Sequence, residues 1–247
     1  MGAVLAHSFW IPDMNATTDQ ERLSIEGVPA AEPESNEAPH MIARINALAV
    51  KIAYPFMAKD DIRFYLNGLN IRPLEDDSVM VVATDGHRYL VVHDQNGYAE
   101  REMIVSVKKD CLKSTNSKNT FDVMSNGSAF VNDEHGMPLF VQPGNSLIEA
   151  EFPRIENVVS AIGYTEGISG AINPAYLKDA LALGQHFNSI RFFTKDQDSA
   201  LVFVVGGMGD LEVFGGIMKL RESFEQLPTW FPKPVLFKLT EPVGAPE

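Results

Sequence analysis

The sequence predicts an α+β fold in which one unit, a helix followed by an antiparallel meander of strands, is repeated along the chain. Expected helices begin near residues 41, 108 and 174, at nearly equal spacing. Short apolar runs follow each of them, separated by turn residues such as Asn126-Gly127 and Pro143-Gly144. One such unit cannot bury both of its faces, so adjacent units are expected to share sheets and to pack their helices side by side.

Composition supports a packed globular protein. The chain has 247 residues, 45% of them hydrophobic, which is enough for one large or two ordinary domains. Its single cysteine, Cys111, excludes an intrachain disulfide framework and favours a reducing compartment. No apolar run is as long as a membrane span, and the N-terminus lacks the pattern of a signal peptide. The expected location is therefore cytoplasmic, with no membrane partner.

The formal net charge of −13 argues against a nucleic-acid binder until its distribution is considered. Residues 1–40 hold seven acidic residues against one arginine, whereas residues 41–59 hold three cations and no acidic residue. A locally basic surface is therefore compatible with the acidic total.

Both ends of the chain differ in composition from its middle. Residues 1–38 combine three prolines and scattered acids with no sustained period, which predicts an acidic, mostly disordered tail. An alternative is that residues 22–28 add an edge strand to a sheet. Residues 222–247 are expected to form a proline-rich extension, because prolines such as Pro228, Pro232, Pro234 and Pro242 make a long regular element unfavourable.

The first unit is expected to begin with a helix from Pro39 that ends or kinks at Pro55. Its apolar residues recur every three or four positions: Ile42, Ile45, Ala49, Ile52 and Phe56. Residues 61–71 alternate in the manner of a half-buried strand, and residues 79–83 form an apolar run. The pair Asp85-Gly86 predicts a two-residue hairpin turn with positive φ at both central positions, after which His87 and Arg88 begin the returning strand.

The second unit is expected to contain a strand at 102–107, a short basic helix at 108–113, and strands near residues 121, 129, 139 and 147. The third should contain a strand near residue 168, a helix capped by Asn173-Pro174 that stops at Gly184, and strands at 189–194, 200–205 and 211–214. Residues 154–163 have helical spacing and are expected to form a short connecting helix.

Several polar residues raise the alternative of an enzyme or a metal site. Histidine and aspartate are the usual residues of both, and they occur as Asp85, His87, His93, Asp94 and His135. Their spacing does not match a helical ligand pair, and the expected turn accounts for Asp85. The glycine-rich residues 206–209 lie between apolar strands, so they predict a hairpin rather than a phosphate loop. We therefore expect no catalytic residue, no metal and no cofactor.

Basic residues recur on the expected helices of the successive units. Those expected to face DNA are Arg44, Lys51, Lys59, Lys108, Lys109, Lys113 and Lys178. Packing the helices side by side would gather these cations on one face. Such a face pairs with phosphates, binds without reading sequence and loses affinity steeply as salt rises.

Two motifs in the middle of the chain resemble a known family. The segments Asp61-Ile62-Arg63-Phe64-Tyr65-Leu66-Asn67-Gly68 and Ala83-Thr84-Asp85-Gly86-His87-Arg88 are similar to the middle domain of the bacterial sliding clamp, the β subunit of DNA polymerase III. Further on, Glu151-Phe152-Pro153 resembles the end of that domain, and Asn173-Pro174-Ala175-Tyr176-Leu177 resembles a helix start in the last domain. The resemblance covers about residues 41–221 and weakens after about residue 94.

The resemblance implies a sliding-clamp fold, with residues 39–152 like the middle domain and 153–221 like part of the last domain. It implies a processivity factor that holds duplex DNA against its helices and tethers a DNA polymerase and other replication proteins. Those partners carry peptides of the form Gln-x-x-Leu-x-apolar, which enter a groove between the two domains. Matching positions give the groove residues Leu66, Thr84, Gly86, His87, Arg88, Pro153, Val158, Tyr176, Ile217 and Met218.

The sequence also departs from that family. No counterpart of a first domain is present, the third unit supplies about half of a last domain, and Tyr89 stands where a smaller apolar residue is usual. A ring would need three or four copies, and an abbreviated phage or plasmid version is the expected origin. The alternative is a monomeric adaptor or decoy that keeps the groove without encircling DNA. Residues 20–25, Gln20-Glu21-Arg22-Leu23-Ser24-Ile25, have the spacing of a groove-binding peptide and could occupy the groove in cis.

Overall fold

The computed structural model describes residues 38–159, 163–196 and 198–221. The expected tail, with its alternative edge strand and its peptide-like segment at 20–25, lies outside the described residues, as does the expected extension at 222–247. Within the described ranges, every helix is too short or too polar to cross a bilayer.

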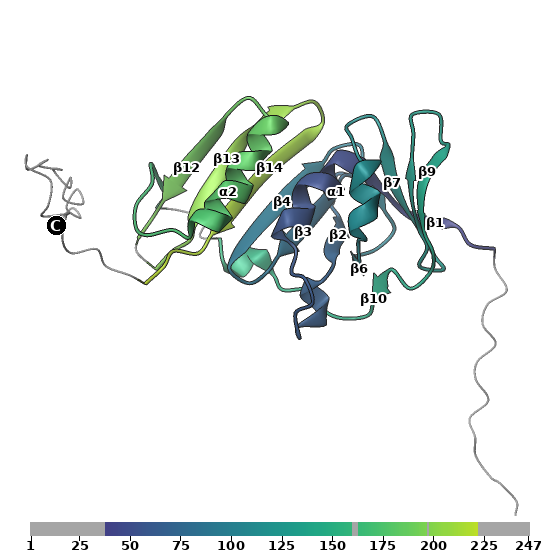
Figure 1. Cartoon of the computed structure of the whole chain (residues 1–247), viewed down its shortest axis with the longest axis horizontal. Helices are drawn as coiled ribbons and strands as arrows, with labels where there is room; N and C mark the ends of the chain where they lie inside the picture. Colours follow the sequence, from purple (N-terminus) through teal and green to yellow (C-terminus); the bar gives the residue numbers. More distant parts are fainter. Residues whose placement is uncertain (1–37, 160–162, 197, 222–247) are drawn as a thin grey trace, which may run out of the picture. The chain divides into compact units, whose positions relative to one another are not determined.

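Two antiparallel sheets form the described chain (Figure 1). The smaller has the order β5-β1-β7-β8-β9: β5 (Tyr98–Ala99), β1 (Met41–Asn46), β7 (Thr120–Met124), β8 (Ala129–Asn132) and β9 (Pro138–Gln142). The larger has the order β10-β6-β2-β3-β4-β14-β13-β12-β11: β10 (Leu147–Ile148), β6 (Met103–Val105), β2 (Leu69–Pro73), β3 (Val79–Thr84), β4 (Arg88–Asp94), β14 (Leu211–Ile217), β13 (Leu201–Met208), β12 (Ile190–Thr194) and β11 (Thr165–Glu166). Because β4 pairs with β14, the segments before and after residue 152 share one continuous sheet.

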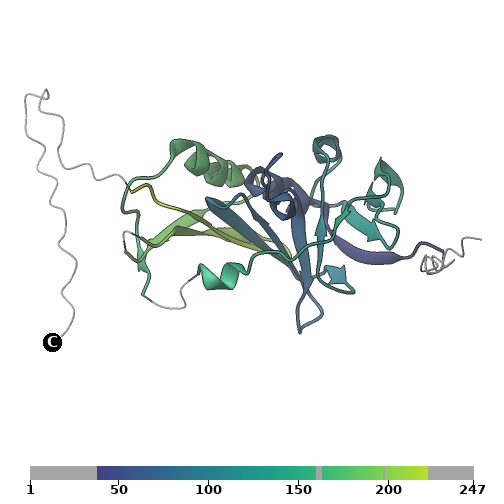
Figure 2. The same cartoon turned by 90° about the horizontal axis from the view of Figure 1, so that it is seen from below.

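Helices lie along one side of the two sheets, which we call the helix face (Figure 2). The two α-helices are α1 (Ala47–Ala53) and α2 (Pro174–Ala182), and the 3₁₀ segments are η1 (Tyr54–Phe56), η2 (Phe64–Leu66), η3 (Lys109–Lys113), η4 (Ile155–Asn157) and η5 (Leu183–Gln185). In Figure 1, α1 lies between α2 and η3. The η4 segment lies on the opposite side of the sheet, which we call the connector face.

Strand alternation divides the core between these two faces. On β4, Leu90 and Val92 belong to the cluster that includes α1, whereas Tyr89 and Val91 belong to a second cluster with Ile155 of η4. Strand β4, in the middle of the larger sheet, is therefore buried on both sides. The second cluster is the smaller one, and it lies beneath the connecting segment.

The predicted helix from Pro39 is wrong in its first part, because residues 41–46 form strand β1. Ala43 and Ile45 are buried beneath α1 while Arg44 between them is exposed, which is the alternation of a strand. Asn46 ends the strand and caps the helix, since its side-chain oxygen accepts a hydrogen bond from the backbone N–H of Leu48 at 2.9 Å. The apolar residues lie on a helix only from residue 47 onward.

The predicted strand at 61–71 is also wrong before Leu69. Ile62 is 96% exposed, which a half-buried strand would not allow. The Asn67 side chain accepts from the backbone N–H of Asp61 at 3.0 Å and donates to its carbonyl oxygen at 2.9 Å. These side-chain bonds close a loop and compete with strand pairing. The sheet therefore begins after the loop.

The remaining strand predictions agree with the structure to within a few residues, from β6 to β14. The basic helix at 108–113 is the 3₁₀ segment η3. The side-chain oxygen of Asn173 accepts from the backbone N–H of Ala175 at 2.9 Å, which confirms the predicted cap of α2. The connecting helix at 154–163 is short: among its described residues only η4 is helical.

Candidate functional site

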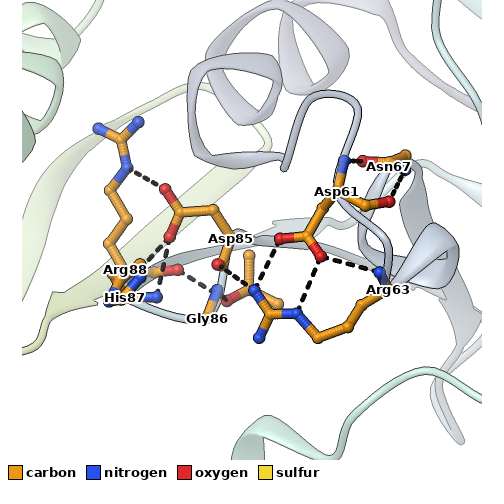
Figure 3. A network of polar contacts seen from close by, with 8 residues as sticks. Asp61, Arg63, Asn67, Asp85, Gly86, His87 and Arg88 are labelled. Atoms are coloured by element: carbon orange, nitrogen blue, oxygen red, sulfur yellow. Dashed lines mark hydrogen bonds and ion pairs between the residues drawn. The ribbon is translucent and has the colours of Figure 1, made fainter.

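The turn between β3 and β4 is organised by the Asp85 carboxylate (Figure 3). One carboxylate oxygen accepts from the backbone N–H groups of His87 at 2.9 Å and Arg88 at 3.0 Å. The hydroxyl of Thr84 donates to the carbonyl oxygen of Arg88 at 2.7 Å. Only Gly86 has positive φ, at 88°, so the predicted turn with two positive φ values is wrong. Aspartate is needed here as a side-chain acceptor rather than as a residue with left-handed backbone.

Arg63 reaches the same turn from the loop before β2 (Figure 3). Its guanidinium pairs with the Asp61 carboxylate at 2.8 Å and donates to the carbonyl oxygen of Asp85 at 3.2 Å. Hydrogen bonds from Arg63 lower the pKa of Asp61 to about 2, so the pair stays charged at neutral pH. A side chain on Gly86 would meet this guanidinium at 2.7 Å, and the positive φ of residue 86 also favours glycine.

Arg88 points to the other side of the turn, into the helix face. Its guanidinium bonds to the carboxylates of Asp85 at 3.0 Å and Asp179 at 2.5 Å, and to the carbonyl oxygen of Pro55 at 2.7 Å. It also lies over the ring of Tyr176, 4.8 Å from the centroid. With its side chain only 10% exposed, Arg88 ties η1, β4 and α2 together.

A cavity of about 300 Å³ opens where this turn meets the connecting segment, and we call it the groove. Its lining residues are Arg63, Tyr65, Leu66, Thr84, Gly86, Arg88, Tyr89, Pro153, Arg154, Ile155, Val158 and Met218. Leu66 is 2% exposed and Val158 is 48% exposed, so the groove has a buried base and an open rim. Four separate stretches of sequence meet here, two of them around Leu66 and Met218, which are 152 residues apart.

Seven of the ten residues expected in the groove line this cavity, namely Leu66, Thr84, Gly86, Arg88, Pro153, Val158 and Met218. The other three do not. His87 stacks on Tyr176 with ring centroids 5.9 Å apart, and Ile217 is fully buried in the cluster beneath the helices. Strand alternation explains Ile217, because its neighbour Met218 points to the opposite side.

Five lining residues were missed from the sequence: Arg63, Tyr65, Tyr89, Arg154 and Ile155. Strand alternation was the signal that could have identified Tyr89. Leu90 packs on the helix side of β4, so Tyr89, next to it on the same strand, must point to the connector face. Arg63 and Arg154 place two cations at the rim, paired with Asp61 and Glu102 respectively. The groove is thus apolar at its base and has ion-paired charged side chains at its edge.

The helix face gathers most of the expected cations. Lys109 and Lys113 lie on η3 and Lys178 on α2, all exposed, and Lys108 precedes η3. Lys113 pairs with Asp110 at 3.1 Å, whereas Lys108, Lys109 and Lys178 form no ion pair within the described residues. Lys51 on α1 is half-buried and donates to the carbonyl oxygen of Thr115 at 3.3 Å. Lys59 lies over the ring of Tyr54, 5.1 Å from its centroid.

Arg44 does not belong to this face. It lies on β1, pointing away from the side on which Ala43 and Ile45 pack beneath α1. Its guanidinium makes two hydrogen bonds to the Asp122 carboxylate, at 2.8 and 2.6 Å. The Asp122 hydrogen bond raises the pKa of Arg44. The prediction that Arg44 faces DNA from a helix is therefore wrong, because the segment is a strand.

The residues that suggested catalysis have other partners. Asp94 is buried and accepts from the backbone N–H of Asn46 at 2.6 Å, and burial raises its pKa. His93 bonds to Ser78 at 2.8 Å and to Glu212 at 3.2 Å. Burial raises the pKa of the Cys111 thiol to about 12, which makes it a poor nucleophile. Across the described ranges, no three histidine, cysteine or acidic side chains are grouped as metal ligands.

Known proteins were compared with the chain by sequence and by structure. No protein-family model matches it, and no curated protein matches by sequence. Solved structures do match. The sliding clamp of Pseudomonas aeruginosa is 16% identical with a TM-score of 0.54, over 75% of this chain and 68% of that one. The β sliding clamp of C. crescentus is 16% identical with a TM-score of 0.53, over 79% and 70%. The DNA polymerase III β subunit of Thermotoga maritima is 15% identical with a TM-score of 0.51, over 80% and 69%. These similarities show that the chain has the sliding-clamp fold, as the sequence predicted.

Proposed function

Starting from this fold, we propose that the protein is a non-enzymatic, sliding-clamp-like processivity factor. It binds duplex DNA through its helix face without sequence preference, and it tethers a DNA polymerase and other replication proteins through the groove. The observation that supports this most directly is the convergence of seven expected groove residues on one cavity. The solved structures with this fold include clamps of three organisms named above.

The groove suits a short extended peptide with apolar anchors. Leu66 and Ile155 are buried at its base, and burying one further leucine or aromatic side chain there would contribute about 1.5–3 kcal/mol. Arg63 and Arg154 at the rim are paired with Asp61 and Glu102, and their remaining N–H groups can donate to backbone carbonyls of a bound peptide. An apolar base with a polar rim is the usual arrangement of a peptide-binding site.

The helix face suits the backbone of duplex DNA. Exposed lysines recur on η3 and α2, so cations are displayed along a row of helices rather than at one point. Such a row contacts phosphates and carries no means of reading bases. DNA association is therefore expected to fall steeply with salt.

The second candidate is a monomeric clamp-like adaptor or decoy that keeps the groove without encircling DNA. It needs only the groove, whose lining residues all come from one chain. Mass in solution separates the two candidates. A multiple of 27.2 kDa at micromolar concentration supports a ring, and a strict monomer that binds peptide but not DNA supports the adaptor.

Peptide binding tests the groove. A fluorescent Gln-x-x-Leu-x-Phe peptide should bind at micromolar strength, and Val158→Glu should abolish binding because it places a charge on an exposed apolar wall. Leu181→Glu is the matched control, since it changes an equally exposed apolar residue outside the groove. Absence of binding up to millimolar peptide would refute the tethering function.

DNA binding tests the helix face with a matched pair of charge reversals. Lys178 lies on α2, whereas Arg191 lies on β12 between Ile190 and Phe192, which pack toward the helices. Arg191 therefore points to the opposite face. Lys178→Glu should weaken low-salt association with duplex DNA several-fold, while Arg191→Glu should leave it unchanged. Equal losses of DNA affinity in the two variants would mean that DNA responds to the total charge of the protein and not to one binding face.

A further inference from the structure

A further cavity, of about 240 Å³, lies among the elements of the helix face, and we call it the polar pocket. Its lining residues are Leu48, Lys51, Asn116, Ser117, Gly184, Gln185, His186, Phe187 and Asn188. The first two belong to α1, the next two follow η3, and the others belong to η5 or come directly after it. Since η5 continues α2, three neighbouring parts of the helix face meet at this pocket (Figure 1).

The polar pocket contains no acidic side chain, although the chain has 33 acidic residues and a net charge of −13. The segments that form it are free of aspartate and glutamate well beyond the lining positions, over residues 41–59, 111–121 and 180–195. The fold brings these three segments together from distant parts of the sequence. Lys51 and His186 are the ionisable groups of the lining, so any charge that the pocket carries is positive.

Lys51 is the only residue of α1 that is not buried, so this helix presents a single charged side chain at the surface. Its ammonium group donates to the carbonyl oxygen of Thr115 at 3.3 Å. That bond leaves two of the three N–H donors of the ammonium for a ligand. Lys51 forms no ion pair within the part of the chain that the structure describes, so an anion can bind without displacing a carboxylate.

His186 lies in the same pocket, directly after η5. Burial and the charge of Lys51 lower the pKa of its ring, which is therefore neutral at neutral pH. An anion held between the two side chains would favour the protonated ring and raise this pKa. Binding of an anion in the polar pocket should thus be accompanied by uptake of a proton.

We propose that the polar pocket holds one phosphate group of the DNA backbone, between the ammonium of Lys51 and the imidazole of His186. This inference rests on the proposed DNA-binding function and names the place where the duplex is held on the helix face. The amide groups of Asn116 and Gln185 can donate further hydrogen bonds to the phosphate oxygens, and the lining has no carboxylate to repel them. The exposed lysines of η3 and α2 flank α1 and can contact neighbouring phosphates.

Removing the charge of Lys51 gives the first test. Lys51→Met keeps most of the length of the side chain and should weaken binding of a fluorescent duplex at low salt several-fold. It should also reduce the slope of log affinity against log salt concentration by about one, because one phosphate contact is lost. Arg191→Met is the control, since it removes one positive charge from the opposite face and should leave the slope unchanged. An unchanged slope in Lys51→Met overturns the inference.

Gly184 allows a second test within the pocket itself. A side chain added there meets no atom within 4 Å, so Gly184→Asp and Gly184→Asn should both fold. The two variants have side chains of the same size and differ in charge. Gly184→Asp should weaken duplex binding several-fold, because a carboxylate would stand beside the phosphate, whereas Gly184→Asn should bind like the wild type. Equal affinities of the two variants would contradict the proposal.

The pH dependence of binding tests the part assigned to His186. Because binding raises the pKa of His186, the duplex affinity of the wild type should increase as the pH falls from about 8 to about 6. His186→Gln should lose part of this increase, and the same pH dependence in both proteins would overturn the assignment. If the wild type binds no duplex at low salt, the proposed DNA-binding function itself fails. If it binds and Lys51→Met binds equally well, only the polar pocket is excluded.

Discussion

The two α-helices have similar caps but very different burial. Both begin after an asparagine whose side chain accepts a backbone hydrogen bond at 2.9 Å, Asn46 for α1 and Asn173 for α2. In α1, six of seven residues are buried, whereas in α2 only Ala180 among nine is buried. The same local signal thus starts two helices whose surroundings differ.

Their positions explain the difference. The α1 helix lies between α2 and η3 and packs on the sheet beneath, so neighbours surround it (Figure 1). The α2 helix has α1 on one side, and Leu181 remains 51% exposed. A repeated helix-plus-meander unit is therefore buried by its neighbours and not by its own sequence alone. The position of each helix in the row of α2, α1 and η3 therefore determines how much that helix contributes to stability.

Truncation of one apolar side chain on each helix gives the largest expected contrast. Ile52→Ala on α1 should lower the free energy of unfolding by about 2–4 kcal/mol, because Ile52 is almost fully buried and a cavity would remain. Leu181→Ala on α2 should change it by no more than about 0.5 kcal/mol. Urea denaturation followed by circular dichroism measures both. A large cost for Leu181→Ala would mean that another surface covers α2 in solution.

The link between the two helices depends on Arg88. Arg88→Met should cost about 3 kcal/mol, because it leaves the Asp85 and Asp179 carboxylates without their shared cation in a mostly buried site. Arg63→Met is the comparison, since it removes a more exposed arginine that reaches the same turn from the loop before β2, and it should change stability little. Similar losses in the two variants would contradict the structural difference between these arginines.

Sequence patterns predicted the strands well and the first helix poorly, for a physical reason. From β6 onward, turn residues and apolar runs leave little ambiguity. Residues 41–46 are different, because Ile42 and Ile45 are three positions apart and so fit a helix as well as a bulged strand. The pairing of β1 with β7, some 80 residues away, decides between the two, and such pairing leaves no local signal.

The sequence likewise predicted some residues of the candidate site correctly and misplaced others. The two motifs around Leu66 and Thr84, where the resemblance is strongest, predicted four lining residues, and the weaker resemblance further along predicted Pro153, Val158 and Met218. Arg44 was misplaced because its segment was taken for a helix, and Ile217 because one step along a strand reverses the face. Tyr89 and Gly216 could not be recognised as a pair, because their contact joins β4 to β14 across more than 120 residues.

That strand pair carries the next prediction, because it joins the α2 unit to the rest of the sheet. Gly216→Val should lower stability by about 1–3 kcal/mol, since its side chain would collide with the Tyr89 ring. Adding Tyr89→Leu should recover most of this loss, because a smaller side chain makes room for the valine. A double-mutant cycle by urea denaturation measures the coupling. Additive losses would mean that the two residues are not packed as described.

Thiol reactivity compares the exposure of the two helical regions, and the one substitution it needs should change the stability of the protein little. Cys111 on η3 is fully buried beside α1, and burial raises its pKa to about 12, so a thiol reagent such as DTNB at pH 8 should react with it only after unfolding. In the Leu181→Cys variant, the new thiol on α2 should react within seconds in the folded protein. Its rate should not depend on protein concentration if α2 faces solvent. Protection of this thiol that increases with concentration would instead show that a second copy of the chain covers α2, and it would connect the low burial of α2 in one chain to assembly.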